Sequence, residues 1–278
     1  MDKHPLELGI ASVVKTYELL DRVRLGRDIT VRDDQFDAEV LLDAARMARA
    51  KGIRLNLLDT GRFDRAGLER MILAGVRLYT SDEARPAEPE LSFLQKACRA
   101  QKTFAAYFHN GPLSVTAVPG TLSHAEIGTL ASQGLDVHIS NSVHARDFSL
   151  MHELAEDAAA GRSYFVYYHH GAPVENMAAL AAGGAWVHFS DRRLGDDASA
   201  ELAVAIAGAA TAAGTRATVH VEAGLPLDLL ERFYAAGGVI LFLTPPADYR
   251  SLARPLEGKA RRRRLPTRAQ WQSAALLP

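Results

Sequence analysis

Four short apolar segments end in the same way, with an ionisable residue, one spacer and a glycine. The glycines are Gly61, Gly111, Gly171 and Gly224, so the pattern recurs after 50 to 60 residues. The ionisable residues at the recurring position are Asp59, His109, His169 and Glu222. Two imidazoles and two carboxylates are ligands that zinc, iron or manganese would use. The sequence therefore predicts that these four residues bind one divalent metal, whose identity it leaves open.

Other polar residues lie near these positions. A metal with an open coordination position lowers the pKa of bound water and supplies a nucleophile at neutral pH. We therefore expect a hydrolase or lyase that acts on a small polar substrate. The residues expected to assist catalysis, as general base or as partners of the ligands, are His138, His188 and His220. The residues expected to bind substrate are Tyr107, Tyr167, Asp82, Asn141 and Asp191.

Two other functions fit the same residues. Without a metal, Glu222 could act as a base and a histidine as an electrophile, in an isomerase or lyase. A non-catalytic protein that binds a small molecule or serves as a scaffold is the other alternative, because the H-x-H opening of metal-dependent barrel hydrolases is absent. The sequence does not separate these readings.

Helices and strands alternate along the chain and would position these residues. A second set of strands is expected at 76–81, 135–140, 185–190 and 239–244, each after a helix that stops at a glycine, and a further strand at 28–33. Apolar residues at helical spacing predict helices at 36–51, 198–213 and 226–236, with a leading helix around 8–24.

This alternation predicts an α/β fold with parallel strands. A βαβα repeat of about 50 residues favours a (β/α)8 barrel of the TIM type, with an extra N-terminal helix and a basic C-terminal tail. Nine strands are one more than a barrel needs, so one strand lies outside it, or the alternative, an open parallel α/β sheet, applies. We expect one barrel domain over 1–256 and a tail over 257–278.

Alternation along each strand predicts which side chains face the barrel interior. In the second set of strands, Val137 and Ile139 would pack under helices while His138 points inward. In the first set, the side chains expected to face the helices are Leu58, Phe108, Tyr168 and Val221. The side chains of the next residues, Asp59, His109, His169 and Glu222, are then expected to point toward the interior. In barrel enzymes the carboxyl ends of the strands carry the chemistry.

Composition excludes several classes of protein. The 278 residues include 33 acidic and 32 basic ones, so overall charge predicts neither a nucleic-acid nor a membrane partner. A single cysteine and the lack of a signal-peptide pattern favour the cytoplasm. Only the basic run 259–264 suggests nucleic acid, and a solvated or docked tail is favoured, with a short helix through Trp271. Residues 84–89 are expected to form a solvated linker, and association with a second copy stays open.

Overall fold

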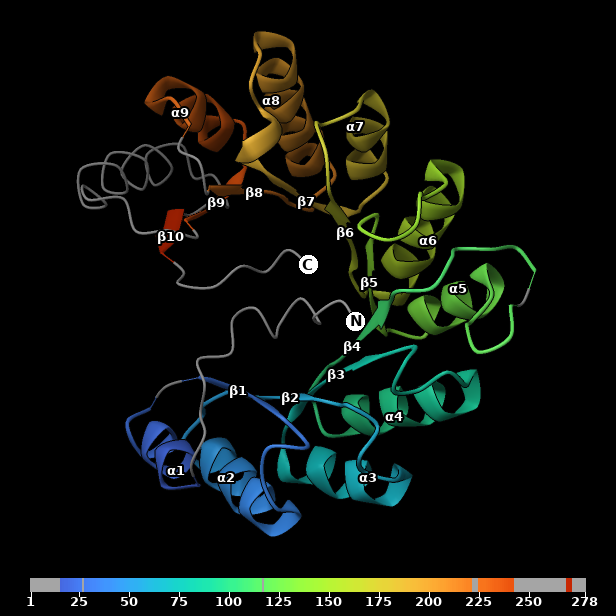
Figure 1. Cartoon of the computed structure of the whole chain (residues 1–278), viewed down its shortest axis with the longest axis vertical. Coiled ribbons are helices and arrows are strands. Elements are labelled where there is room, and N and C mark those ends of the chain that lie inside the picture. The colour runs from blue at the N-terminus through green and yellow to red at the C-terminus, as the bar shows by residue number, and fades with distance from the viewer. Residues whose placement is uncertain (1–15, 27, 117, 222–224, 243–268, 272–278) are drawn as a thin grey trace. The chain divides into compact units, whose positions relative to one another are not determined.

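The computed structural model describes residues 16–26, 28–116, 118–221, 225–242 and 269–271 (Figure 1). The strands are β1 (Ile29–Arg32), β2 (Leu55–Leu58), β3 (Arg77–Ser81), β4 (Ala105–His109), β5 (Asp136–Ser140), β6 (Phe165–His169), β7 (Trp186–Ser190), β8 (Ala217–Val221), β9 (Val239–Phe242) and β10 (Ala269–Trp271). The helices are α1 (Thr16–Arg24), α2 (Ala38–Ala50), α3 (Arg65–Ala74), α4 (Glu88–Ala100), α5 (His124–Ser132), α6 (Phe148–Gly161), α7 (Glu175–Ala182), α8 (Asp197–Ala212) and α9 (Leu227–Ala235), with a 3-10 turn at Asp191–Arg193.

The described residues form two compact units, an N-terminal unit of residues 16–138 and 160–163 and a C-terminal unit of 139–159 and 164–271. In the N-terminal unit β1 to β4 are parallel neighbours in chain order, and in the C-terminal unit β6 to β10 follow the same rule. Parallel strands that alternate with helices in chain order make this a (β/α)8-type α/β fold, as the repeat predicted. The nine predicted strands all form.

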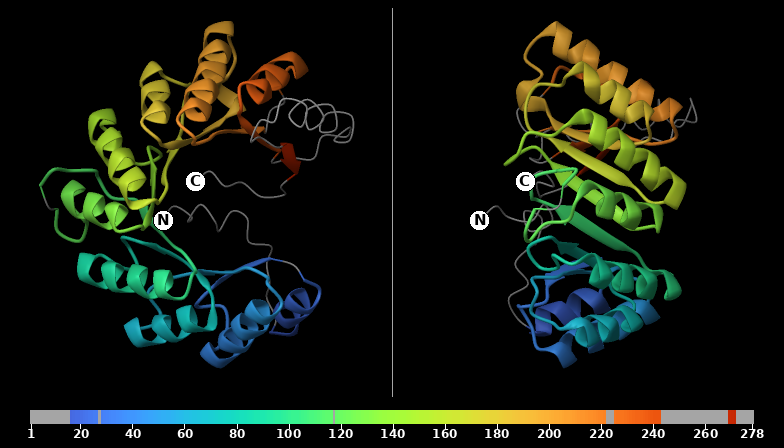
Figure 2. Two further views of the ribbon diagram at one scale, coloured as in Figure 1. Left: turned by 180° about the vertical axis from the view of Figure 1, so that it is seen from behind. Right: turned by 90° about the vertical axis from the view of Figure 1, so that its right-hand side faces the viewer.

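In each unit the helices cover one face of the strands (Figures 1 and 2). The side chains of that face are fully buried, as at Leu57 and Leu78 in the N-terminal unit. In the C-terminal unit Phe189 of β7 meets Phe233 of α9 edge to face, with ring centroids 5.8 Å apart. Tyr167 of β6 similarly meets a ring at the start of α6. These contacts identify the helix-covered face strand by strand.

The strand register corrects the prediction of which residues face the helices. Paired residues of parallel neighbours lie on the same face of a sheet. His169 pairs with Phe189, which contacts α9, so His169 lies on the helix-covered face. Tyr107 pairs with Thr80, which lies two residues after the buried Leu78 on the same face. His109 lies two residues after Tyr107 and therefore also faces the helices. Asp59, which follows Leu58 in β2, also lies there because Leu58 pairs with Tyr79 on the opposite face.

The reason for this error is that the first set of strands is apolar on both faces. Neighbouring positions such as Leu57 and Leu58, or Tyr167 and Tyr168, are equally hydrophobic, so alternation alone does not identify the buried side. In the second set the assignment of His188 opposite the helices agrees with the register. In β9, Leu241 pairs with His220 and so lies on the face opposite to the one predicted.

Four helices are followed by glycines with nearly the same left-handed backbone. Gly75, Gly134, Gly184 and Gly237 have φ values of 101° to 103°. The predicted helix stops are therefore confirmed at these positions. A side chain would strain the backbone there, because L residues rarely adopt this conformation.

Gly161, the last residue of α6, packs directly against the backbone at the end of α5. A Cβ atom there would overlap the carbonyl oxygen of Ala131 and the backbone of Ser132. We expect Gly161→Ala to lower the free energy of unfolding by about 1–3 kcal/mol through this overpacking. Urea denaturation followed by circular dichroism would measure the change.

Gly208 supplies a matched control within α8. A Cβ atom at Gly208 would meet no other atom within 4 Å. Gly208→Ala should therefore raise stability by about 0.5–1 kcal/mol, the helix preference of alanine over glycine. Equal effects of the two substitutions would contradict the close approach at Gly161.

The part of the tail that the structure describes differs from the prediction. Residues 269–271 form β10, which pairs in parallel with β9, rather than a helix through Trp271. The basic run 259–264 lies outside the described residues. Within those residues, the helices are too short or too polar to cross a membrane.

Candidate functional site

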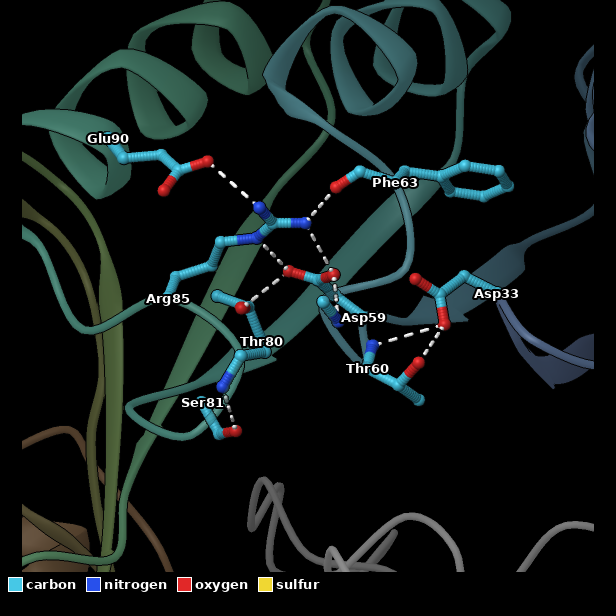
Figure 3. A network of polar contacts seen from close by, with 10 residues as sticks. Asp33, Asp59, Thr60, Phe63, Thr80, Ser81, Arg85 and Glu90 are labelled. Carbon is cyan, nitrogen blue, oxygen red and sulfur yellow. Dashed lines mark hydrogen bonds and ion pairs between the residues drawn. The ribbon is translucent and has the colours of Figure 1, made fainter.

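Asp59 is held by a buried ion pair with Arg85 at the end of β2 (Figure 3). Two guanidinium nitrogens of Arg85 donate to the two carboxylate oxygens at 2.8 and 3.0 Å. The Thr80 hydroxyl donates at 2.8 Å and the Gly61 amide at 3.0 Å. These four hydrogen bonds use the accepting capacity of the carboxylate. Asp59 therefore ties β2, β3 and the following loop together.

Sequence reasoning missed Arg85, because residues 84–89 were read as a solvated linker. Its side chain is buried and also pairs with Glu90 at 2.9 Å and with the Phe63 carbonyl oxygen (Figure 3). Burial by itself lowers the pKa of Arg85, but the hydrogen bonds and charge of Asp59 outweigh it and raise the pKa. The signal available in the sequence was an arginine shortly after the end of β3, the strand next to the one that Asp59 follows.

The residue that follows each of β1, β3 and β5 caps the backbone after the next strand. Asp33 after β1 accepts from the Thr60 amide at 3.1 Å and from its hydroxyl at 2.6 Å. Asp82 after β3 accepts from the Asn110 and Gly111 amides at 3.0 and 2.7 Å. In the C-terminal unit, Asn141 after β5 accepts from the His170 amide at 2.6 Å. Asp82 and Asn141, which were predicted to bind substrate, thus hold strand ends in place.

One carboxylate oxygen of Asp33, Oδ2, has no hydrogen-bond partner in the described part of the chain. Burial raises the pKa of Asp33, the Thr60 hydrogen bonds lower it, and the charge of Asp59 raises it further, for a net increase. Since the folded pKa lies above the unfolded one, Asp33 favours folding most below pH 4, and this contribution is lost as the pH rises.

We expect Asp33→Asn to remove this loss while keeping an oxygen for Thr60. The variant should therefore be more stable than the unaltered protein at pH 7, and this advantage should shrink toward pH 4, because the raised pKa favours the protonated carboxyl group of folded Asp33 as the pH falls. Urea denaturation at the two pH values would measure this. A gain that is the same at both would show that charge burial is not the cause.

His109 and His169 sit in closely similar surroundings in the two units. Nδ1 of each ring meets a tyrosine hydroxyl of the same strand, Tyr107 at 3.3 Å and Tyr167 at 2.9 Å. Nε2 of each ring meets a backbone carbonyl three residues on, that of Pro112 at 3.3 Å or of Ala172 at 2.8 Å. Because a carbonyl only accepts, Nε2 carries the hydrogen.

Burial sets the protonation of these groups. It lowers the pKa of His169, with a smaller opposing effect from the Ala172 carbonyl. It raises the pKa of both tyrosine hydroxyls. His169 is therefore a neutral ring whose Nδ1 lone pair accepts a hydrogen bond from the Tyr167 hydroxyl. His109 Nδ1 also lies 3.5 Å from Asp82 Oδ2.

These residues do not fit the predicted metal site. An imidazole binds a metal through a lone pair, yet both Nε2 atoms donate to carbonyls and Asp59 is bound by Arg85. Among the described residues, no group of three or more His, Cys, Asp or Glu side chains is placed to hold a metal. Glu222 lies outside the described residues. The metal stays a prediction of the sequence.

The other predicted histidines behave differently. His188 of β7 and His220 of β8 form a direct hydrogen bond, with Nδ1 of His188 2.9 Å from Nε2 of His220. Both rings lie on the sheet face opposite the helices and are buried, with 3 % and 0 % of their surfaces exposed. Burial lowers the pKa of His220 to about 3, so this ring is neutral at pH 7.

The hydrogen bond between the two rings limits the positions of their hydrogens to two arrangements. Two neutral imidazoles carry two hydrogens on four nitrogens, and one hydrogen must lie between the rings. The outer nitrogens, His188 Nε2 and His220 Nδ1, then comprise one donor and one acceptor. When the outer nitrogen of one ring takes up a proton, the bridging hydrogen can shift to the other ring, which then releases the hydrogen on its own outer nitrogen, so that both rings are neutral again and the two roles are exchanged. The pair, which we call the His188–His220 dyad, can therefore take up a proton at one end and release one at the other.

Two aromatic side chains contact the His188 ring of the dyad, and sequence reasoning missed one of them, Trp186. Trp186 and Tyr168 contact the His188 ring, and Thr218 is its neighbour on β8. Tyr168 had been assigned to the helix side, and Trp186 had no assigned role. Trp186 lies two residues before His188, so strand alternation was the signal that would have placed both rings on one face.

The remaining predicted residues do not join the dyad in the structure. His138 stacks on Phe108 in the N-terminal unit, with ring centroids 4.3 Å apart. Asp191 is buried directly after β7. Asp191 occupies the position that corresponds to Asp33, Asp82 and Asn141, but the loop that follows β8 includes residues 222–224, outside the described part.

Comparisons with known proteins give no family. No protein-family model and no curated protein matches the sequence. Among solved structures, the chain is similar to a mandelate racemase/muconate lactonizing protein from Herpetosiphon aurantiacus, at 15% identity and a TM-score of 0.38, over 77% of this chain and 52% of that one. It thus spans about half of that protein.

Two further structures have comparable similarity. A deoxyribose phosphate aldolase from Aeropyrum pernix matches at 18% identity and a TM-score of 0.30, over 66% of this chain and 92% of that one. A citrate synthase, SbnG, matches at 14% identity and a TM-score of 0.34, over 91% of this chain and 92% of that one. No activity is transferred to this chain at these identities and scores.

Proposed function

We propose that the protein is a (β/α)8-type enzyme that transfers a proton on a small polar substrate, with the His188–His220 dyad as its acid–base group. It keeps the metal-free isomerase or lyase reaction but differs from the sequence expectation, in which Glu222 is the base, because His188 and His220 here take the acid–base role. The reaction class is proton transfer at a carbon next to a carbonyl group, which needs a base and an acid close together.

The observation that carries the proposal is a buried nitrogen in need of a partner. Nδ1 of His220 is fully buried and has no hydrogen-bond partner among the residues that the structure describes. Because a buried polar atom is normally hydrogen-bonded, such an atom in a native protein points to a bound water or ligand. In either arrangement of the bridging hydrogen this nitrogen offers a donor or an acceptor to that occupant.

The dyad also has the requirements of an acid–base group. His220 stays neutral near pH 7, so it orients His188 without adding charge. His188 is an imidazole, the side chain most often used as a general acid or base because it can donate a hydrogen at one nitrogen and accept one at the other. His220 would serve as the hydrogen-bonding partner that orients the His188 ring, as a carboxylate orients the histidine in other dyads.

The test is exchange of carbon-bound hydrogen with deuterated water, followed by proton NMR. The substrates are small 2-keto acids, 2-hydroxy acids and their amides, each incubated with the protein and with a chelator in a parallel sample. We expect exchange with at least one of these compounds, at least 100-fold slower in His188→Gln and in His220→Gln. His152→Gln on α6, which alters an exposed histidine paired with Glu156, is the matched control.

Three outcomes would count against the proposal. Exchange that both dyad variants retain would place the chemistry elsewhere. Exchange abolished by the chelator would favour the metal prediction. No exchange with any of these compounds would remove the proposed substrate class.

A further inference from the structure

The His188 ring contacts two aromatic side chains. Tyr168 of β6 has its ring centroid 4.7 Å from that of His188, with 35° between the planes. Trp186, which lies on β7 like His188, has its ring centroid 4.9 Å from that of His188, with 32° between the planes. Among described residues, the aromatic contact of His220 is with His188 itself, at 5.2 Å. The two imidazoles of the dyad thus have different surroundings.

Trp186 is itself held in place. Its indole N–H donates to the hydroxyl of Thr218 at 2.7 Å, and Thr218 is completely buried. Thr218 pairs with His188 in the register of β7 and β8. One buried threonine therefore sets the position of the indole ring beside the imidazole.

We infer that Trp186, fixed by Thr218, is a positioning residue that makes His188 the ring of the dyad that carries the positive charge. This inference rests on the proposed function, since it assigns the charged ring of the same dyad. The π-face of an indole attracts a cation, and the attraction is strongest where water is excluded. Tyr168 provides a second ring beside the same imidazole, whereas burial without such a ring keeps His220 neutral.

Other groups around His188 modify this effect. Arg216 at the start of β8 lies 5.4 Å from the indole centroid and competes for the same π-electrons. The neutral groups nearby are the hydroxyls of Tyr168, Ser190 and Thr218 and the ring of His220. None of these hydroxyls carries a charge near pH 7, whereas Arg216 does.

The test is titration of the histidine rings by NMR in the full chain, labelled with 13C and 15N at histidine and assigned with His188→Gln. Trp186→Leu removes the π-face and should lower the pKa of His188 by about 0.5 unit. Trp186→Phe keeps a π-face and should retain most of the original value. Thr218→Val frees the indole and should lower the pKa partly, while Thr218→Ser should restore it.

Phe104→Leu is the matched control, since Phe104 is an aromatic ring that contacts Arg77 and Tyr79 and no imidazole. It should leave the titration of His188 unchanged. An unchanged pKa in Trp186→Leu would overturn the inference, as would protonation of His220 before His188. If Trp186→Leu does not fold, the comparison of Thr218→Val with Thr218→Ser decides, and equal values in the two would overturn it.

The titration needs no substrate, so its failure is distinct from failure of the proposed function. A shifted pKa without hydrogen exchange would leave the charge assignment in place and remove the enzyme activity. Exchange without a shift would do the reverse.

Discussion

Replacing Arg85 with methionine is expected to lower the free energy of unfolding by about 3–5 kcal/mol. The substitution removes the cation from a buried pair and leaves the Asp59 carboxylate charged in a place that water does not reach. It also leaves the Phe63 carbonyl and Glu90 without this donor. Urea denaturation monitored by far-ultraviolet circular dichroism would measure the loss.

Two further variants separate charge burial from loss of packing. Asp59→Asn combined with Arg85→Met removes both charges and should recover part of the lost stability, because the cost of a buried unpaired charge disappears. Arg46→Met breaks an exposed ion pair with Asp43, whose side chains are 62% and 67% exposed, and should cost less than about 1 kcal/mol. If Arg85→Met behaves like Arg46→Met, the Asp59–Arg85 pair is not desolvated.

Acid is expected to destabilise the protein through His220. The pKa of His220 is about 3 in the folded state, compared with an ordinary value of 6.5 in the unfolded chain. The unfolded chain therefore binds more protons than the folded one between these two pH values. The stability that His220 contributes is therefore present above pH 6.5 and is lost as the pH falls toward 3. The loss between pH 7 and pH 5 is about 2 kcal/mol, and near pH 3 it approaches about 5 kcal/mol.

His220→Gln should remove this part of the acid sensitivity. Its free energy of unfolding should fall by about 2 kcal/mol less than that of the unaltered protein between pH 7 and pH 5. Trp186 lies beside the dyad and provides a fluorescence signal for unfolding of the C-terminal unit. His152→Gln, an exposed substitution, should keep the full acid sensitivity. The same slope in both variants would show that His220 is not buried as a neutral ring.

The alternation of strands and helices followed from the sequence alone. Apolar residues at helical spacing, short β-rich segments and glycines after helices are local signals, and local signals fix where an element begins and ends. The helix stops at Gly75, Gly134, Gly184 and Gly237 show this, because left-handed backbone depends on the residue itself. Parallel order followed in turn, because strands separated by helices need crossover connections.

The faces of the strands were decided by tertiary structure. His109, His169 and Asp59 stand at one position of the repeat, and the sequence suggested that such a position forms one site. Their strands are apolar on both sides, so only the hydrogen-bonded register with β3 and β7 placed them on the helix-covered face. A shift of one residue moves a side chain to the other side of a sheet.

The partners of the polar residues also required the fold. The sequence singled out Asp59, His188 and His220 as ionisable residues near strand ends. It could not show that Arg85 lies against Asp59, 26 residues along the chain, or that His188 and His220 are hydrogen-bonded across 32 residues. A residue type limits what a side chain can do, but its neighbours determine whether it is paired, neutral or able to move a proton. Those neighbours come from other strands, which only the packing of the chain brings together.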